Sequence, residues 1–333
     1  MKKGLFLNDR LRVSLTNSCN YQCKYCSNEG QVHNTNIFIN VDFLTKLFKK
    51  IEEEDIYVKK INLTGGEPLL HKDLLKIASE ASKICHDITV NTNGSLLTVQ
   101  LVDDLVQAGV NCIKFGIDNP FNHFSKPVTN NVKVDIERLR EVIMYSIKKI
   151  PRSSLNIVIT RYNINILPQI VKWVADNKIN NVEFIELIDF DFKAHNPLLG
   201  DEPYDFINLI QDIKNCFYNI EYNQKLAKYI AYHRDGIIMQ FAEDFCKNRV
   251  CANLWTRVDS SGCFSPCIKS SDVYQIDLDN SLESQLINQR KLYCNSLSNH
   301  IPRDTDGNLT SIPQKTIKET KKLLTDKLTE LDI

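Results

Sequence analysis

The stretch LRVSLTNSCNYQCKYC, residues 11–26, runs from a predicted β-strand into three closely spaced cysteines. The strand covers residues 11–16, and Cys19, Cys23 and Cys26 follow with three and then two residues between them. Similar runs rich in Val, Ile, Leu and Phe recur at residues 60–64, 87–92, 112–118, 155–160 and 182–188. Because these runs show little alternation of polar and apolar residues, we expect strands that are covered on both faces.

Helical patterns separate these strands, at residues 41–54, 72–85, 96–108, 135–150 and 164–177. Asp42 and Thr98 stand near helix starts, and Gly109 follows a helix end, as capping predicts. Alternating strands and helices indicate a parallel sheet with right-handed crossovers. We therefore predict an α/β fold whose first part is a partial (β/α)6 barrel.

Ligands of such folds bind at the carboxyl ends of the strands. Residues 17–26, 65–68 and 93–94, together with Asp118 and Arg161, follow predicted strands. We expect them to meet at one mouth.

The strand–helix rhythm stops after residue 189. A proline-containing linker at residues 196–203 precedes a predicted helix at 204–217 and two hairpins, at 229–241 and 254–268. We predict three parts: the barrel at residues 1–195, a small α+β domain at 196–300, and a helical tail at 301–333.

The chain has 333 residues with 41 basic and 41 acidic side chains, so its formal net charge is zero. This balance gives no reason to expect a nucleic-acid partner. The N-terminus lacks the apolar core of a signal peptide, and no apolar run reaches the length of a membrane span. We expect a cytoplasmic protein.

Eleven cysteines in a reducing compartment need an explanation, and clustered thiols there usually bind metal. Structural zinc prefers four protein ligands, and only His33 lies near the triplet to join it. A [4Fe–4S] cluster has four irons, so three thiolates leave one iron open for another ligand. The triplet therefore favours an iron–sulfur cluster over zinc.

Two motifs together carry a family resemblance. The Cys-x3-Cys-x2-Cys spacing, with the aromatic Tyr25 before the last cysteine, and the later run 64–68, Thr-Gly-Gly-Glu-Pro, resemble the radical S-adenosylmethionine (SAM) superfamily. The resemblance implies that the open iron chelates SAM and that SAM is cleaved to a 5′-deoxyadenosyl radical, which takes a hydrogen atom from a substrate. The SAM-binding residues it implies are Tyr25, Gly65, Gly66, Glu67, Pro68, Thr92, Asn93 and Asp118.

Some of these roles stay open at this stage. The two glycines would let the backbone approach the methionine end of SAM. Glu67 would either accept hydrogen bonds from the amino group of SAM or hold its own loop. Asn93 and Asp118 would either contact SAM or stabilise local turns.

A closer resemblance, over residues 11 to about 190, is to the GTP 3′,8-cyclase branch of the superfamily. Residues 11–16, 63–74, 89–97 and 182–188 carry it. That branch has a second [4Fe–4S] cluster, held by three C-terminal cysteines, whose open iron meets the substrate. Here the corresponding candidates are Cys246, Cys251 and Cys267, in a pattern that also resembles SPASM/twitch auxiliary-cluster domains. Cys263 would be a fourth ligand, and zinc or buried structural thiols are the alternatives.

The sequence also departs from this branch. Four residues rather than two separate Cys246 from Cys251, and the branch's basic run is reduced to Arg257. The chain ends in Leu-Asp-Ile instead of Gly-Gly. The candidate substrate residues are Arg12, Glu186, Trp255 and Arg257. Because a triphosphate needs several cationic donors, two arginines favour a substrate other than GTP.

The resulting hypothesis is a radical SAM enzyme that acts on a small polar substrate (a nucleotide, nucleoside or sugar-like molecule) and takes electrons from an external flavodoxin- or ferredoxin-type donor. Its reaction type, whether cyclisation, oxidation, epimerisation or cross-linking, stays open. One alternative is a GTP 3′,8-cyclase proper. Another is a maturase with a peptide substrate, although about ten residues before the first strand leave no room for a preceding peptide-recognition domain. The last is a non-enzymatic iron–sulfur or zinc regulatory protein.

Overall fold

The computed structural model describes residues 4, 6, 9–23, 25–26, 36–121, 135–187, 206–223, 228–242, 256–265 and 273–296. The predicted linker at 196–203 and the predicted tail at 301–333 lie outside these residues.

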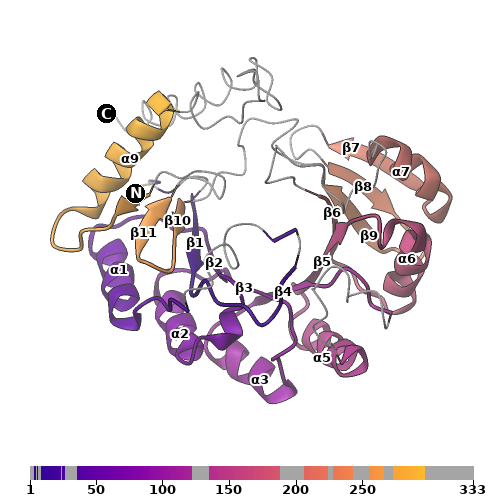
Figure 1. The fold of residues 1–333 in the computed structure, drawn as a ribbon, viewed down its shortest axis with the longest axis horizontal. Coiled ribbons are helices and arrows are strands. Elements are labelled where there is room, and N and C mark those ends of the chain that lie inside the picture. Colours follow the sequence, from indigo (N-terminus) through magenta and orange to yellow (C-terminus); the bar gives the residue numbers. More distant parts are fainter. Residues whose placement is uncertain are drawn as a thin grey trace.

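Six neighbouring parallel strands form the centre of the fold, as predicted. They follow one another in sequence order and curve into an open arc, a partial barrel (Figure 1). The strands are β1 (Arg10–Ser14), β2 (Lys60–Thr64), β3 (Ile88–Thr92), β4 (Cys112–Gly116), β5 (Ser154–Ile159) and β6 (Val182–Glu186).

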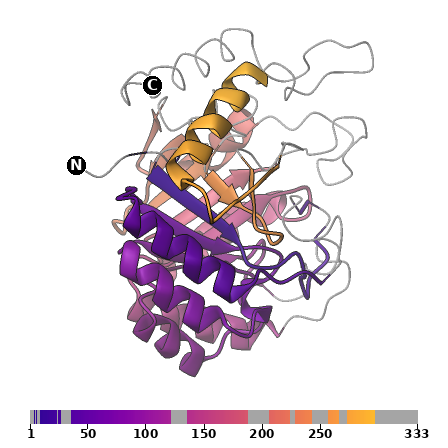
Figure 2. The ribbon, with the colours of Figure 1, turned by 90° about the vertical axis from the view of Figure 1, so that its left-hand side faces the viewer.

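Helices cover the outer face of this arc, and their bounds agree with the predicted ones to within three residues (Figures 1 and 2). Thr98 caps its helix by accepting a hydrogen bond from the Leu101 amide at 3.1 Å, whereas Asp42 lies in a first turn that Asn40 caps. The helices are α1 (Val41–Glu53), α2 (Leu74–Ile84), α3 (Val99–Gln107), α5 (Ile136–Lys149) and α6 (Leu167–Asp176), with short 3₁₀ turns η2 (Pro68–Leu70) and η3 (Ile164–Ile166).

The two faces of the central strands differ in polarity, contrary to the prediction from sequence. The face toward the helices is apolar and fully buried, as at Ile61 and Leu63 of β2 or Ile113 and Phe115 of β4. The alternate positions, which face the inside of the arc, are largely polar: Arg12, Asn62, Thr89, Asn91, Lys114, Ser154, Asn156 and Glu183. Asn62, Thr89 and Ser154 on the inner face are buried, so this face is covered in part, but its residues are polar and do not form the packed apolar layer of a closed barrel.

The strands after residue 206 extend the same sheet at both of its ends. In the described residues the order is β12-β11-β10-β1-β2-β3-β4-β5-β6-β9-β8-β7, with β9 parallel to β6 and β10 parallel to β1. The sheet thus runs across the predicted boundary at residue 195, and the three-part division stays a prediction. The elements are α7 (Phe206–Ile213), η4 (Lys214–Cys216), β7 (Asn219–Asn223), β8 (Lys228–Tyr232), β9 (Ile238–Ala242), β10 (Thr256–Val258), β11 (Cys263–Ser265), β12 (Tyr274–Gln275) and α9 (Leu282–Ser296).

Both predicted hairpins are present, as β8–β9 and β10–β11. Their turns contain Gly236 and Gly262, whose φ angles are 78° and 80°. Such positive values favour glycine. The strands β7 and β12 and the helix α9 were not predicted.

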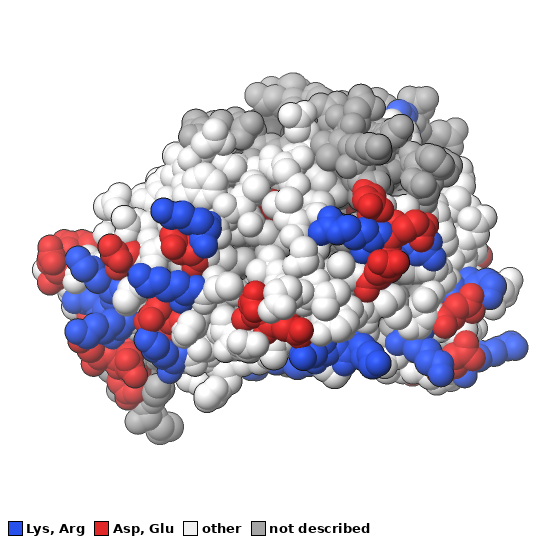
Figure 3. Space-filling view, turned by 90° about the horizontal axis from the view of Figure 1, so that it is seen from below, with Lys and Arg blue, Asp and Glu red and all other residues white. Residues whose placement is uncertain are grey.

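The surface carries mixed charges. Basic and acidic side chains are interspersed on the face seen in Figure 3. Pairs such as Lys83–Glu80 at 2.7 Å and Arg152–Asp87 at 2.7 Å bring opposite charges together. Among the described helices, none is both long and apolar enough to cross a membrane.

The junction between β6 and β9 gives a test of the extended sheet. Phe184 and Phe241 are fully buried there, with stacked rings whose centroids are 4.6 Å apart. We expect Phe241→Ala to lower the free energy of unfolding by about 3–5 kcal/mol in urea denaturation. Ile238→Ala, in the same strand at a site 44% exposed, is the matched control and should cost at most about 1 kcal/mol. If Phe241→Ala and Ile238→Ala lowered the free energy of unfolding by the same small amount, the hairpin would not pack on β6.

Candidate active site

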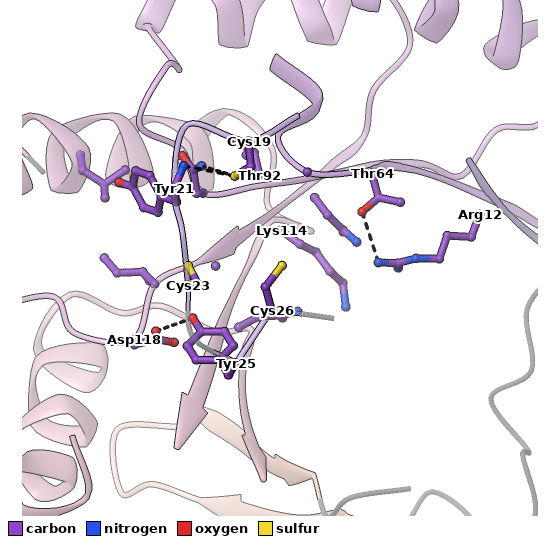
Figure 4. A pocket seen from close by; sticks show the side chains of 18 of the residues that line it. Arg12, Cys19, Tyr21, Cys23, Tyr25, Cys26, Thr64, Thr92, Lys114 and Asp118 are labelled. Carbon is purple, nitrogen blue, oxygen red and sulfur yellow. Dashed lines mark hydrogen bonds between the residues drawn. The ribbon is translucent and has the colours of Figure 1, made fainter. Parts of the chain in front are cut away.

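A cavity of about 220 Å³ opens at the carboxyl ends of β1 to β4, where the sequence predicts a ligand mouth (Figure 4). It brings together most of the predicted SAM-site residues with several that were not predicted. The lining residues are Arg12, Cys19, Tyr21, Cys23, Tyr25, Cys26, Thr64, Gly65, Gly66, Asn91, Thr92, Asn93, Lys114, Gly116, Ile117, Asp118, Ile136, Leu139 and Asn156.

The three cysteines of the triplet all face this cavity and are half-buried. The Tyr21 amide donates a hydrogen bond to Cys19 Sγ at 3.3 Å, which favours a thiolate. Burial acts in the opposite sense and raises the pKa of Cys19 and Cys23 above the ordinary thiol value. Bound iron would supply the positive charge that keeps these thiols deprotonated.

The arrangement fits a cluster better than a single metal ion. Within the described residues, no three His, Cys, Asp or Glu side chains converge as ligands of one ion. A cubane cluster does not require such convergence, because each thiolate binds a different iron. Three thiols around one cavity therefore suit a [4Fe–4S] cluster with one iron left open.

The two glycines after β2 fit tightly against the cysteine loop. The Gly66 amide donates to the Thr16 carbonyl, and the Glu67 amide donates to the Ser18 carbonyl, both at 2.8 Å. A Cβ on Gly65 would lie 2.4 Å from the Thr16 oxygen, and one on Gly66 would lie 2.1 Å from the Ser18 oxygen. Gly65 also has a φ of 137°. Only glycine permits this backbone-to-backbone contact, which fixes the start of the loop that carries Cys19.

Glu67 holds the loops in place. It is fully buried, and its carboxylate accepts hydrogen bonds from Thr92 Oγ1 at 2.7 Å, the Asn93 amide at 2.8 Å and the Leu69 amide at 3.0 Å. Burial raises its pKa to about 7, although these hydrogen bonds oppose the rise. These hydrogen bonds hold the loop of Glu67 in place, and its contact with SAM stays a prediction. Pro68, also buried, opens the short turn η2 beside it.

Asn93 connects the loop after β3 to the cysteine loop. Its side-chain amide donates to Asn20 Oδ1 at 2.9 Å, and its own Oδ1 accepts from the Ser95 amide at 2.9 Å. Asn20 in turn donates to Ser95 Oγ at 2.8 Å. Asn93 therefore stabilises the local turn, as predicted. Its side-chain amide nitrogen also lies 3.9 Å from Cys19 Sγ.

Tyr25 and Asp118 form a hydrogen-bonded pair across the cavity wall (Figure 4). The tyrosine hydroxyl donates to Asp118 Oδ2, while Oδ1 accepts from the Val158 amide at 3.1 Å. Burial raises the pKa of Asp118 to about 6, and the two hydrogen bonds oppose that rise. Both carboxylate oxygens therefore serve to join the cysteine loop to β4 and β5.

The predicted substrate residues lie in different places. Arg12 lines the cavity, with its guanidinium 3.2 Å from Thr64 Oγ1. Arg257 is buried in β10, directly beside Arg12 in register. Glu186 is buried but is not among the cavity-lining residues, and alternation in β6 places it on the side of Phe184, opposite Glu183. Trp255 lies outside the described residues.

Of the predicted auxiliary-cluster ligands, the structure describes only Cys263. It begins β11, on the same face as Arg257 by strand alternation, and its Sγ donates to Gln275 Oε1 at 3.4 Å. Cys246, Cys251 and Cys267 lie outside the described residues, so their role stays a prediction.

The cavity also contains residues that the sequence analysis missed, among them Asn91, Lys114, Gly116 and Asn156. The available signal was period-two alternation in the short strands, with Asn91 next to the apolar Val90, and Lys114 between Ile113 and Phe115. These strands are so short that the alternation was not apparent.

Comparison with known proteins agrees with this geometry. Residues 13–174 match the model of the radical SAM superfamily. A GTP 3′,8-cyclase of Staphylococcus epidermidis is 30% identical over 276 residues, which cover 78% of each chain. The chain belongs to the radical SAM superfamily. It is therefore a radical SAM enzyme, and the predicted fold and the predicted membership are confirmed.

Other relatives extend the comparison. A probable GTP 3′,8-cyclase of Methanocaldococcus jannaschii is 28% identical over 280 residues, covering 79% of this chain and 85% of that one. The solved structure of anSMEcpe with bound SAM has a TM-score of 0.63 at 14% identity, with 97% and 98% coverage. Streptococcus suis SuiB bound to SAM has a TM-score of 0.61 at 14% identity; 85% of this chain is covered, but it spans only 65% of SuiB. These structures share the fold.

The contact at Gly66 gives a direct test of the loop arrangement. We expect Gly66→Ala to lower the iron content after anaerobic reconstitution and to destabilise the protein by about 3 kcal/mol, because its Cβ would displace the Ser18 carbonyl and the cysteine loop. Gly236→Ala is the control: no atom of the residues that the structure describes would lie within 4 Å of its Cβ, and its positive φ should cost about 1 kcal/mol without loss of iron. Wild-type iron content in Gly66→Ala would contradict the account.

Proposed function

We propose that the protein binds a [4Fe–4S] cluster through Cys19, Cys23 and Cys26 and uses it to cleave SAM reductively, starting a reaction on a small polar substrate. The observation that carries this is the placement of all three thiols on one cavity, together with the Gly65–Gly66 contact that fixes their loop. Membership of the radical SAM superfamily supports the same chemistry.

When bound, cluster and SAM supply a 5′-deoxyadenosyl radical, which abstracts a hydrogen atom from the substrate. The residues of this chain position the parts. Glu67 and Asn93 connect the cysteine loop to β3, and the Tyr25–Asp118 pair connects it to β4. Ile117, Ile136 and Leu139 line one part of the cavity and exclude water from it.

The polar inner face of the sheet supports a polar substrate. Arg12 and Lys114 line the cavity and Arg257 lies beside Arg12, so three cationic side chains stand on or near the described wall. Buried polar groups are costly unless they are paired. A nucleotide, nucleoside or sugar-like molecule has the donors and acceptors to pair with such a wall.

GTP 3′,8-cyclase activity is the second candidate, favoured by relatives of that name at 25–30% identity. A peptide substrate is a third possibility, since one structural neighbour was solved with its precursor peptide. We further propose that Cys246, Cys251 and Cys267, with Cys263 as a fourth ligand, hold a second [4Fe–4S] cluster, and that an external flavodoxin- or ferredoxin-type protein donates the electron.

The first test uses SAM alone. With a chemical reductant, the reconstituted wild type should form 5′-deoxyadenosine, and Cys23→Ala should form no more than a reaction without protein, because one of the three cluster ligands is lost. Cys85→Ala removes a buried cysteine at the C-terminal end of α2, which does not line the cavity, and this variant should still cleave SAM. Full cleavage by Cys23→Ala would contradict the cluster assignment.

The same reaction with GTP separates the candidates. A cyclised nucleotide formed by wild type and lost in Cys23→Ala would establish the cyclase. SAM cleavage without any cyclised product would remove that candidate and leave another polar substrate.

Iron and sulfide analysis tests the second cluster. We expect about eight irons per reconstituted wild-type chain and about four in the double variant Cys251→Ala/Cys267→Ala, because each cysteine group holds one [4Fe–4S] cluster. Cys85→Ala/Cys112→Ala, at two buried cysteines outside both groups, is the matched control and should retain the wild-type count. About four irons in all three proteins, with or without zinc, would contradict a second iron–sulfur cluster.

A further inference from the structure

The inner wall of the cavity carries buried polar atoms that the described residues leave without hydrogen bonds. They are Asn91 Oδ1 and Asn156 Oδ1; Ser154 Oγ on β5 is also buried without such a bond, but Ser154 does not line the cavity. Lys114 on β4 is paired with Asn91 on β3 and with Ser154 on β5. Two residues further along β4, Gly116 is paired with Asn156 on β5. An unpaired buried polar group costs about 1–3 kcal/mol. The two asparagines line the cavity together with Lys114, and a ligand that pairs with them best explains their unpaired oxygens.

Lys114 is only loosely held. Its Nζ lies 3.8 Å from Glu183 Oε2, too far for a good hydrogen bond. Glu183 is bonded more closely by Lys228, which also donates to Gln240 Oε1 at 3.1 Å. Burial alone would raise the pKa of Glu183, but the two lysines outweigh it and hold that pKa below its ordinary value. One carboxylate thus faces two ammonium groups, and the wall keeps a net positive charge at Lys114.

Space for a ligand exists directly beside this charge. Gly116 follows Lys114 by two residues on the same face of β4 and is exposed to the cavity. Among the described residues, a Cβ there would have only the Thr92 carbonyl within 4 Å, at 3.9 Å. Unlike Gly65 and Gly66, this glycine is not pressed against backbone, so its missing side chain leaves open room.

We propose that Lys114, Asn91 and Asn156 form a substrate subsite that binds an anionic group, carboxylate or phosphate, with hydroxyl or amine groups beside it. The inference rests on the proposed function and adds that the substrate carries a negatively charged group. Lys114 forms a charge-assisted hydrogen bond to the anion. Each asparagine amide offers a donor and an acceptor to the neighbouring groups.

The subsite lies on the same cavity as the cysteine loop. Figure 4 shows Lys114 on the cavity wall together with Cys23, Cys26 and Asp118, and Arg12 stands farther along with Thr64. A substrate anchored at Lys114 is thereby kept next to the place where the cluster would hold SAM. Lys114 is a specificity residue in this account, and Glu183 and Lys228 are positioning residues that act through it.

The test measures binding directly and does not require turnover. Calorimetric titration of the reconstituted, SAM-loaded protein compares anionic probes with neutral parents: GTP with guanosine, UMP with uridine, glucose 6-phosphate and gluconate with glucose. We expect at least one anion to bind about tenfold or more tightly than its parent, as charge-assisted hydrogen bonding predicts. A phosphate or a carboxylate preference then identifies the anion.

Three variants assign the preference to Lys114. Lys114→Gln should reduce the difference to about twofold or less, whereas Lys114→Arg, which keeps the charge, should retain it. Lys172→Gln removes an exposed lysine that pairs with Asp176 on α6 and should behave as wild type. Thermal denaturation shows whether each variant is folded.

Two results would overturn the proposal: no wild-type preference for any anion, or a preference that a folded Lys114→Gln retains. Either result leaves the SAM-cleavage test unaffected. Conversely, failure to cleave SAM with the anion preference intact would contradict the proposed function and not the subsite.

Discussion

The backbone contact between the loops after β1 and β2 is the constraint on which the site depends. Gly66 and Glu67 donate their amides to the carbonyls of Thr16 and Ser18, just before Cys19. No side chain fits between the two loops, and the left-handed φ of Gly65 aims the chain into the contact. Glu67 then fastens the pair to β3 through Thr92 and Asn93. A mobile cysteine loop would be a poor cluster site, and these bonds hold it in one place.

The polarity of the inner face is the second determinant of function. A barrel filled with Val, Ile and Leu is a packed core and binds nothing inside. Here the inward positions carry polar side chains, so the interior is stable only with compensating partners. Glu183, Lys114 and Lys228 partly compensate one another, while Asn91 Oδ1 and Asn156 Oδ1 accept no hydrogen bond from the described residues. The unpaired polar groups therefore lower the stability of the fold and leave a polar wall to which a ligand can bind.

Much of the fold could be predicted because its signals are local. The six central strands, five helices and two hairpins were found at nearly the right residues, since apolar periodicity and turn glycines are encoded within each segment. The attachment of the hairpins to opposite ends of the sheet could not be found this way. Pairing of β10 with β1 joins residues about 245 apart, and no local pattern reports it.

The sequence located the cysteines and glycines that line the cavity, but it did not reveal most of the residues that support them. Cysteine spacing and the glycine run identified the triplet and its neighbouring loop, because metal ligation and close backbone approach restrict residue type strongly. The roles of Glu67 and Asp118 were ambiguous, since a carboxylate at a strand end serves a ligand or a loop equally well until its partners are known. Lys114 was missed because one lysine within an apolar strand resembles an ordinary surface charge.

The most direct measurement is electron–nuclear hyperfine spectroscopy of the reduced, reconstituted protein with SAM labelled with ¹⁵N at its amino group and ¹⁷O at its carboxylate. We expect couplings from both labels to the cluster spin in wild type and in the Cys251→Ala/Cys267→Ala variant, because Cys19, Cys23 and Cys26 would hold the cluster whose fourth iron is open to SAM. A cluster signal that shows no coupling to either label would contradict the assignment of this cavity as the SAM site.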